Sequence, residues 1–203
     1  MKSLTKDLLT VAKFAAKDEG RERITKVYID DEKMIATDSY LLLQVKHTGY
    51  EQKDWPKFDE NTKPVIKLEK PILLSADIIK KSVRLNKRAE LPVYGDAFLT
   101  NETEKTVSIT TTDGQTTNKI DLTKDDGSEY PNVSEMMDKW TKDKPKVSIT
   151  LNAEYMEKLM KAFRTEGISA VVIKVYDKNK PIVVIGNEKA NENKTGMLMP
   201  IRS

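Results

Sequence analysis

The sequence contains no cysteine and only one histidine among its 203 residues. Disulfide bonds and thiolate metal sites are therefore excluded, and the absence of cysteine is in keeping with a reducing cytoplasm. No run of about 18 apolar residues exists, so no segment is expected to span a membrane. The N-terminal stretch also lacks the apolar core and cleavage site of a signal peptide. We therefore expect a cytoplasmic protein.

The motifs of common catalytic and cofactor chemistry are also missing. There is no Gly-x-Gly-x-x-Gly motif and no phosphate-loop lysine motif. His47 has no serine or cysteine nucleophile signature beside it, and we interpret it as a surface residue at a strand end. The acidic clusters at 30–32 and 125–126 fall in predicted turns, where carboxylates are solvated. We expect no metal, no cofactor and no catalytic residue, and hence a binding protein rather than an enzyme.

The composition describes a folded chain with a heavily charged surface. Hydrophobic residues make up 38% and charged residues 33% of the sequence, which is typical of a globular rather than a disordered protein. The formal net charge is only +3, which is too small to indicate nucleic-acid binding by itself. A basic binding face would have to be local.

One pattern, an amphipathic helix followed by strands, occurs three times along the chain. Helices are predicted at 5–17, 76–85 and 153–165. Ser75 and Asn152 immediately precede the second and third helices and are predicted N-caps. The polar stretches 51–63 and 125–145 are interpreted as connectors.

The remaining apolar stretches favour strands in antiparallel sheets. Asp113-Gly114 lies between two threonine-rich runs and predicts a two-residue hairpin loop with positive φ at both positions. Because a helix with its strands cannot bury its sheet alone, such units should pair. We expect an α+β fold whose helices line one face and whose antiparallel sheets form the other. The predicted strands are 24–30, 33–47, 89–101, 105–122, 146–152, 169–177, 181–187 and 195–202.

Basic side chains recur on the polar sides of all three predicted helices. Acidic neighbours such as Glu154 and Glu157 favour an ordinary solvated surface. If the helices share one face, however, their charges add into a surface that attracts phosphate without reading sequence. Both interpretations stay open. The candidate DNA-facing residues are Lys13, Lys17, Lys80, Lys81, Arg84, Lys87, Arg88, Lys158, Lys161 and Arg164.

Three short stretches, in order, resemble motifs of one family. Residues 36–42, Ala-Thr-Asp-Ser-Tyr-Leu-Leu, resemble Ala-Thr-Asp-Gly-His-Arg-Leu, with Ser39 in place of glycine. Tyr130-Pro131 resembles the start of Phe-Pro-Asp-Tyr. The tail 198–202, Leu-Met-Pro-Ile-Arg, resembles Val-Met-Pro-Met-Arg. These are motifs of the bacterial DNA polymerase III beta sliding clamp, which this chain resembles in a shortened form.

The resemblance implies a domain organisation. Residues 1–138 resemble the middle domain of the clamp, as two half units at about 1–50 and 64–138. Residues 146–203 resemble only the second half of its last domain. The other parts of the clamp, which close the ring by head-to-tail contacts, have no counterpart, so the resemblance does not imply a ring. A homo-oligomer would arise if the unpaired third half unit pairs with its copy.

The resemblance also implies a peptide-binding cleft between the middle domain and the C-terminal tail. Its partners would be short peptide segments of DNA polymerases or repair proteins, held by an adaptable apolar surface. For the tail, the alternative is an ordinary half-buried edge strand. The cleft residues carried over are Thr37, Ser39, Tyr40, Leu41, Leu42, Pro131, Met136, Leu198, Met199, Pro200, Ile201 and Arg202.

Two functions follow as expectations. The first is a sliding-clamp-like processivity protein that associates with duplex DNA non-specifically and tethers its peptide partners. The second is a clamp-fold adaptor or decoy that binds protein partners without contacting DNA.

Overall fold

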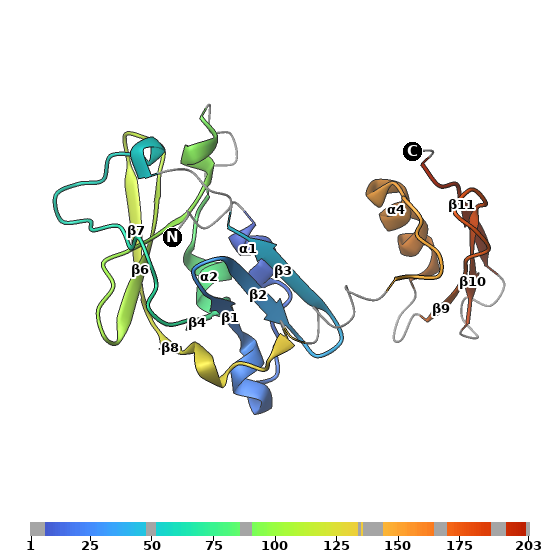
Figure 1. The fold of residues 1–203 in the computed structure, drawn as a ribbon, viewed down its shortest axis with the longest axis horizontal. Helices are drawn as coiled ribbons and strands as arrows, with labels where there is room; N and C mark the ends of the chain where they lie inside the picture. The colour runs from blue at the N-terminus through green and yellow to red at the C-terminus, as the bar shows by residue number, and fades with distance from the viewer. Residues whose placement is uncertain are drawn as a thin grey trace. The chain divides into compact units, whose positions relative to one another are not determined.

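The computed structural model consists of two compact units, Met1–Asn132 and Val133–Ser203. All strand pairs in the described sheets are antiparallel, and helices pack on them, as the two groups of elements in Figure 1 show. The predicted α+β class is confirmed. The structure describes residues 7–47, 52–85, 91–133, 135, 144–164, 170–187 and 194–201.

A five-stranded sheet of order β3-β2-β1-β4-β8 joins strands from the early and the later part of the first unit. β1 pairs with β2 on one edge and with β4, much later in the chain, on the other. Val27 and Ile29 of β1 point to the same side and are fully buried, as a strand with period-two alternation requires. The strands are β1 (Lys26–Ile29), β2 (Lys33–Thr37), β3 (Leu42–Lys46), β4 (Ile72–Ser75) and β8 (Asp125–Asp126).

The second sheet of this unit has the order β5-β6-β7, with β5 at Phe98–Thr100, β6 at Thr106–Thr112 and β7 at Thr117–Thr123. The outer edge of β5 is completed by residues 63–65. Pro64 bridges Thr100, and the N–H of Val65 donates to the carbonyl of Leu99 at 2.9 Å. Both sheets supply side chains to one hydrophobic core.

Helices α1 (Leu8–Ala12) and α2 (Ala76–Ser82) fill that core together. Ser75 caps α2 as predicted, because its Oγ accepts the N–H of Ile78 at 3.4 Å. The prediction of a helix over 5–17 is wrong in extent. The chain turns at Lys13 and Phe14 so that the N–H of Ala16 reaches the carbonyl of Ile24 at 2.9 Å, which ends the helix early.

Short 3-10 turns occupy several connections of the first unit: η1 (Glu19–Thr25), η2 (Gln52–Asp54), η3 (Pro92–Gly95) and η4 (Gly127–Glu129). The strand predicted over 89–101 is therefore partly wrong, since Pro92 opens η3 and only β5 is extended. The strand predicted over 33–47 is also wrong as one piece. It is a hairpin of β2 and β3 with a turn at 38–41.

The hairpin of β6 and β7 has a four-residue loop instead of the predicted two-residue loop. Thr112 pairs with Thr117, and the N–H of Asp113 donates to the carbonyl of Thr116 at 3.2 Å. Only Gly114 has positive φ, at 93°. The Asp113 carboxylate accepts the N–H groups of Gln115 and Thr116, which favours the longer loop.

The stretch after β7 is part of the first unit, so the prediction of a connector starting at 125 is wrong for its first residues. β8 pairs with β4, and the Tyr130 ring packs on Tyr28 with their centroids 5.4 Å apart. Burial raises the pKa of the Tyr130 phenol to about 12.

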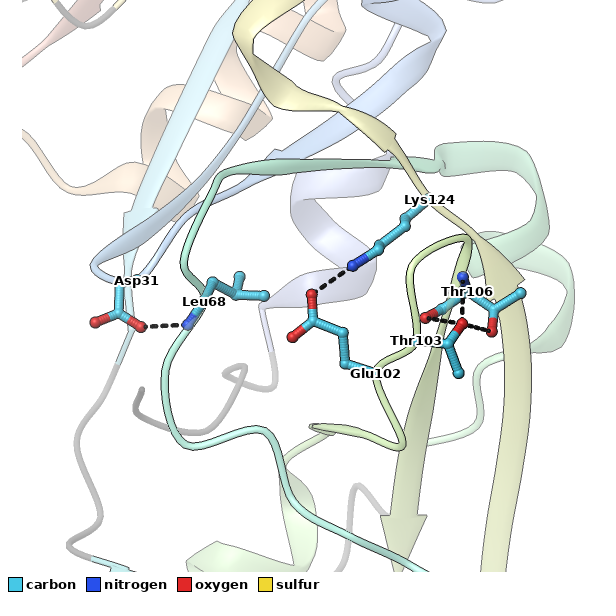
Figure 2. A network of polar contacts seen from close by, with 6 residues as sticks. All are labelled: Asp31, Leu68, Glu102, Thr103, Thr106 and Lys124. Atoms are coloured by element: carbon cyan, nitrogen blue, oxygen red, sulfur yellow. Dashed lines mark hydrogen bonds and ion pairs between the residues drawn. The ribbon is translucent and has the colours of Figure 1, made fainter.

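A network of polar contacts ties loops of the first unit to its sheets (Figure 2). The Asp31 carboxylate accepts the N–H of Leu68 at 3.1 Å. Lys124 and Glu102 form a half-buried ion pair at 2.5 Å. In the loop between β5 and β6, the hydroxyl of Thr103 accepts the N–H of Thr106 at 3.0 Å. The first two of these contacts join residues that are far apart in the sequence.

In the described part of the second unit, helix α4 (Ala153–Phe163) packs on a three-stranded sheet of order β11-β10-β9. The strands are β9 (Val171–Lys174), β10 (Ile182–Gly186) and β11 (Thr195–Leu198). Asn152 caps α4 as predicted, since its Oδ1 accepts the N–H of Tyr155 at 3.0 Å. The strand predicted at 146–152 is not formed. Among the described residues, the N–H of Ile201 donates to the carbonyl of Thr150 in this segment at 2.8 Å.

Candidate functional site

The turn between β2 and β3 carries the predicted cleft residues Ser39, Tyr40 and Leu41, and Thr37 and Leu42 flank it at the ends of the two strands. Side chains of this segment fix its backbone. The Asp38 carboxylate accepts the N–H groups of Tyr40 at 2.9 Å and Leu41 at 2.7 Å. The Thr37 hydroxyl donates to the carbonyl of Leu41 at 2.7 Å and accepts the N–H of Ser39. The N–H bonds from Leu41 and Tyr40 lower the pKa of the Asp38 carboxyl, so the turn holds its anchor ionised.

This turn presents large side chains to solvent. Tyr40 is 88% exposed and Leu41 is 59% exposed, whereas Thr37 is buried and Leu42 is half-buried. Ser39 has a φ of 81°, a conformation that glycine adopts without strain, and the resembled motif has glycine at this place. The backbone of the turn is therefore glycine-like although the residue is serine.

Ser39 and Pro131 line one open groove of about 620 Å³ in the first unit. Pro131 follows Tyr130, whose packing on Tyr28 fixes the chain at that point. The Arg21 guanidinium donates to the Ser39 hydroxyl at 3.1 Å. Two predicted cleft residues that are far apart in the sequence thus face the same space.

Charged side chains dominate the rest of this groove, and no sequence pattern predicted them. Arg23 pairs with Glu129 at 3.3 Å. Lys26 pairs with Glu22 at 2.8 Å and with Asp125 at 2.9 Å. The hydrogen bond to Glu22, joined by Asp125, raises the pKa of the Lys26 ammonium above its ordinary value although partial burial opposes this. The clustered charges at 21–23 were the available signal, but their acidic partner at 125 lies far along the chain.

The C-terminal tail is described within the second unit. Leu198 is buried against the helix side of the sheet, in a cluster with Phe163, Ile182 and Val184. Met199 and Ile201 are exposed and Pro200 is half-buried. The bond from the N–H of Ile201 to the carbonyl of Thr150 ties the tail to the segment before α4. The tail therefore combines one buried anchor with apolar side chains that face solvent. The predicted cleft residues Met136 and Arg202 lie outside the described residues.

Most of the described candidate basic residues lie on exposed surface, and two of their charges are partly neutralised by ion pairs. Lys81 pairs with Asp77 at 2.6 Å and Lys161 pairs with Glu157 at 2.7 Å, both one helical turn apart. Lys13, Lys17, Arg84, Lys158 and Arg164 are exposed, and Lys80 is half-buried. α1 and α2 pack side by side in the first unit. Lys80 and Lys81 lie on α2, whereas Lys13, Lys17 and Arg84 follow the ends of these helices. Lys87 and Arg88 lie outside the described residues.

His47 is buried, so its interpretation as a surface residue is wrong. Its N–H donates to the carbonyl of Glu32, and Nε2 lies 2.9 Å from the carbonyl oxygen of Asp30. Burial lowers the pKa of the imidazole below its ordinary value of 6.5. Among the described residues, no group of three or more histidine, aspartate or glutamate side chains is arranged to hold a metal ion. No described helix is long and apolar enough to cross a membrane.

Comparison with solved structures finds a similar protein. The structure is similar to a DNA polymerase sliding clamp from Bacillus subtilis. The TM-score is 0.47 and the sequence identity is 14%. The match covers 97% of this chain and 52% of the clamp chain, so this chain spans about half the length of that protein. No family model and no curated protein matches the sequence.

Proposed function

We propose that this protein is a sliding-clamp-related, DNA-associated binding protein that captures short apolar peptides of DNA polymerases or repair proteins. Its work would be non-covalent: peptide capture combined with weak attraction to phosphate. The peptide-binding residues would be the turn at 37–42 with Pro131 in the first unit, and the tail from Leu198 to Ile201 in the second. Met136 and Arg202 remain part of the proposal from the sequence resemblance.

The observation that carries the proposal is the exposure of Tyr40 and Leu41 on a rigid turn. Large apolar side chains held in solvent by an ordered backbone are typical of a binding surface, because they offer contact area without an ordering cost on binding. The Tyr40 phenol adds a polar group at the rim. The groove beside Ser39 and Pro131 would receive polar parts of a peptide, since charged groups line most of it.

The tail would supply the apolar part of peptide recognition. Met199 and Ile201 are exposed, and methionine adapts its shape to different apolar partners. The adjacent Leu198 is buried, which anchors the tail to its own unit and leaves its neighbours available. Short Leu and Phe anchors of a partner peptide match these side chains in chemistry.

A fluorescence polarisation titration tests this proposal. The full chain is titrated against a short fluorescent peptide with Leu and Phe anchors. The double variant Met199→Ala with Ile201→Ala is expected to lose at least about tenfold in affinity while keeping its circular dichroism spectrum. Met197→Ala is the matched control, because Met197 is exposed on β11 and is not among the proposed contacts. An affinity equal in the double variant and the control contradicts the proposal.

The second candidate is an adaptor or decoy that binds such peptides without touching DNA. The ion pairs of Lys81 and Lys161 favour it, because they reduce the charge that the helices offer to phosphate. Binding to duplex DNA over a series of salt concentrations separates the two candidates. A DNA-associated protein loses affinity with a log–log slope of about −0.9 per neutralised phosphate. Absence of binding even at low salt favours the adaptor.

A further inference from the structure

The second half of the first unit provides an internal template for the second unit. In it, β4 runs directly into α2, and β5, β6 and β7 follow. The residues after β7 return as β8 and pair with β4, where Leu73 lies opposite Asp125. The N–H of Gly127 continues this pairing by donating to the carbonyl of Pro71 at 2.9 Å.

The second unit repeats this order of elements. Residues 148–151 run directly into α4, and β9, β10 and β11 follow. The residues after β11 return to the segment before the helix, since Ile201 donates to Thr150 at 2.8 Å. Residues 148–151 thus correspond to β4, residues 199–201 to β8, and β9 to β5. The caps correspond as well, with Ser75 before α2 and Asn152 before α4.

In the first unit, other segments cover the free edges of the half from β4 to β8. The described residues of the second unit include no counterpart of these segments. β1 pairs with the free edge of β4 over the register Lys26–Ser75 to Ile29–Ile72. Residues 63–65 pair with the free edge of β5, and α1 packs beside α2. Among the described residues of the second unit, no strand pairs with the outer edge of β9, and no second helix lies beside α4 (Figure 1).

The exposed fractions of the side chains on β1 and near β9 differ accordingly. Val27 and Ile29 on the helix-facing side of β1 are fully buried. Val171 contacts the core beneath α4, so Ile173, two residues later on β9, faces the same side of the sheet. Val175 follows directly after β9 ends. Ile173 is nevertheless 45% exposed and Val175 is 46% exposed. Among the described residues, α4 therefore leaves this side of the sheet half uncovered at Ile173.

The backbone of β9 also points hydrogen-bonding groups outward. The N–H of Asn187 donates to the carbonyl of Ala170, which makes these two a hydrogen-bonded pair of the β9–β10 ladder. Since such pairs alternate along an antiparallel ladder, the backbone groups of Val171 and Ile173 point away from β10. An uncovered edge of this kind is a template for another strand.

We propose that two copies of this protein associate through their second units. In the dimer, residues 148–151 of each copy pair with β9 of the other about a two-fold axis. The resulting sheet has the order β11-β10-β9, then 148–151 and 199–201 of the second copy, which reproduces β3-β2-β1-β4-β8 of the first unit. A second copy is the partner that fits, because one two-fold axis pairs β9 and residues 148–151 of each copy with those of the other. The first unit is no such partner, since its own two halves already pair with each other through β1 and β4.

Sedimentation equilibrium of the full chain over a wide concentration range tests the dimer. We expect reversible dimerisation, and a dissociation constant at least about a hundredfold weaker in Ile173→Lys with Val175→Lys, because charges on this side of an edge strand block pairing. The control Met197→Lys places a charge on an exposed position of β11 and should leave the constant unchanged. A strict monomer at the highest concentration overturns the proposal, as does a dimer that the double variant leaves intact.

Engineered cysteines keep the test decisive if the lysine variant fails to fold. The natural chain has no cysteine, so Thr150→Cys with Val172→Cys gives a clean background. Both positions lie on the sheet side opposite α4, since Ile149, Leu151 and Val171 face the helix. Within one copy, β10 and the β11–tail strand separate them by about 14 Å, too far for a disulfide. Mild oxidation should give a covalent dimer from the double variant and not from either single variant. Exclusively monomeric product overturns the proposal.

Discussion

Gly127 lies directly against the backbone of Pro71. Its N–H donates to the Pro71 carbonyl at 2.9 Å, and a Cβ at this glycine would be 2.6 Å from the Pro71 carbonyl carbon. The contact sits where β8 returns to β4, so it positions the chain leading to Tyr130 and Pro131. Both sides of the contact are backbone or a rigid ring, which leaves no flexible group to move aside.

Gly127→Ala should therefore destabilise the protein by about 1–3 kcal/mol through overpacking. Urea unfolding followed by circular dichroism measures the change. Gly20→Ala is the matched control, because the nearest atom to its Cβ would be the flexible Asp18 carboxylate at 3.2 Å. Equal stabilities for the two variants would contradict the close approach at Pro71.

Ser39 should be replaceable by glycine but not by a branched residue. Its φ of 81° costs a residue with a Cβ about 1–2 kcal/mol, which glycine does not incur. Ser39→Gly should leave stability unchanged or raise it slightly, although it loses the hydrogen bond from Arg21. Ser39→Val should lower the free energy of unfolding by more than about 1 kcal/mol. Chemical denaturation of both variants checks the order, and a valine variant as stable as the glycine variant would refute the left-handed turn.

Local signals predicted much of this fold. Ser75 and Asn152 have the side chains of N-caps and fulfil that role in the structure, because capping depends on neighbours three residues away. The failures arose from distant contacts. The helix at α1 ends early where Ala16 pairs with Ile24, and the connector at 125 becomes β8 because β4 offers an edge. No local pattern contains such information.

For the candidate site, too, local motifs pointed to some residues, and others were missed because they meet only through distant contacts. Tyr40, Leu41 and the tail were assigned to a peptide cleft by resemblance to short motifs, which are contiguous in sequence, and this assignment stays a prediction. The charged lining of the groove was not predicted, since Lys26 and Asp125 meet only through the pairing of β1, β4 and β8. The burial of His47 was missed because it depends on Glu32 and Asp30 across the β2–β3 hairpin.

His47 should make stability depend on pH. Burial lowers the pKa of its imidazole in the folded state below 6.5, so the unfolded chain takes up the proton first as the pH falls. The stabilisation is complete above the unfolded pKa and declines as the pH drops through 6.5 toward the folded pKa. Unfolding free energies at about pH 7.5 and about pH 5.5 should differ more in the natural protein than in His47→Gln. An equal difference in both proteins would refute this assignment.

The most direct test of the proposed function is whether the two exposed apolar sets bind the same peptide. The affinity of a fluorescent Leu/Phe peptide is measured by polarisation for Tyr40→Ala with Leu41→Ala, and for Ile66→Ala, an exposed residue of the first unit outside the proposed contacts. We predict a loss of at least about tenfold for the turn variant, matching the loss for Met199→Ala with Ile201→Ala, and none for the Ile66 control. Full affinity in the turn variant would contradict the account.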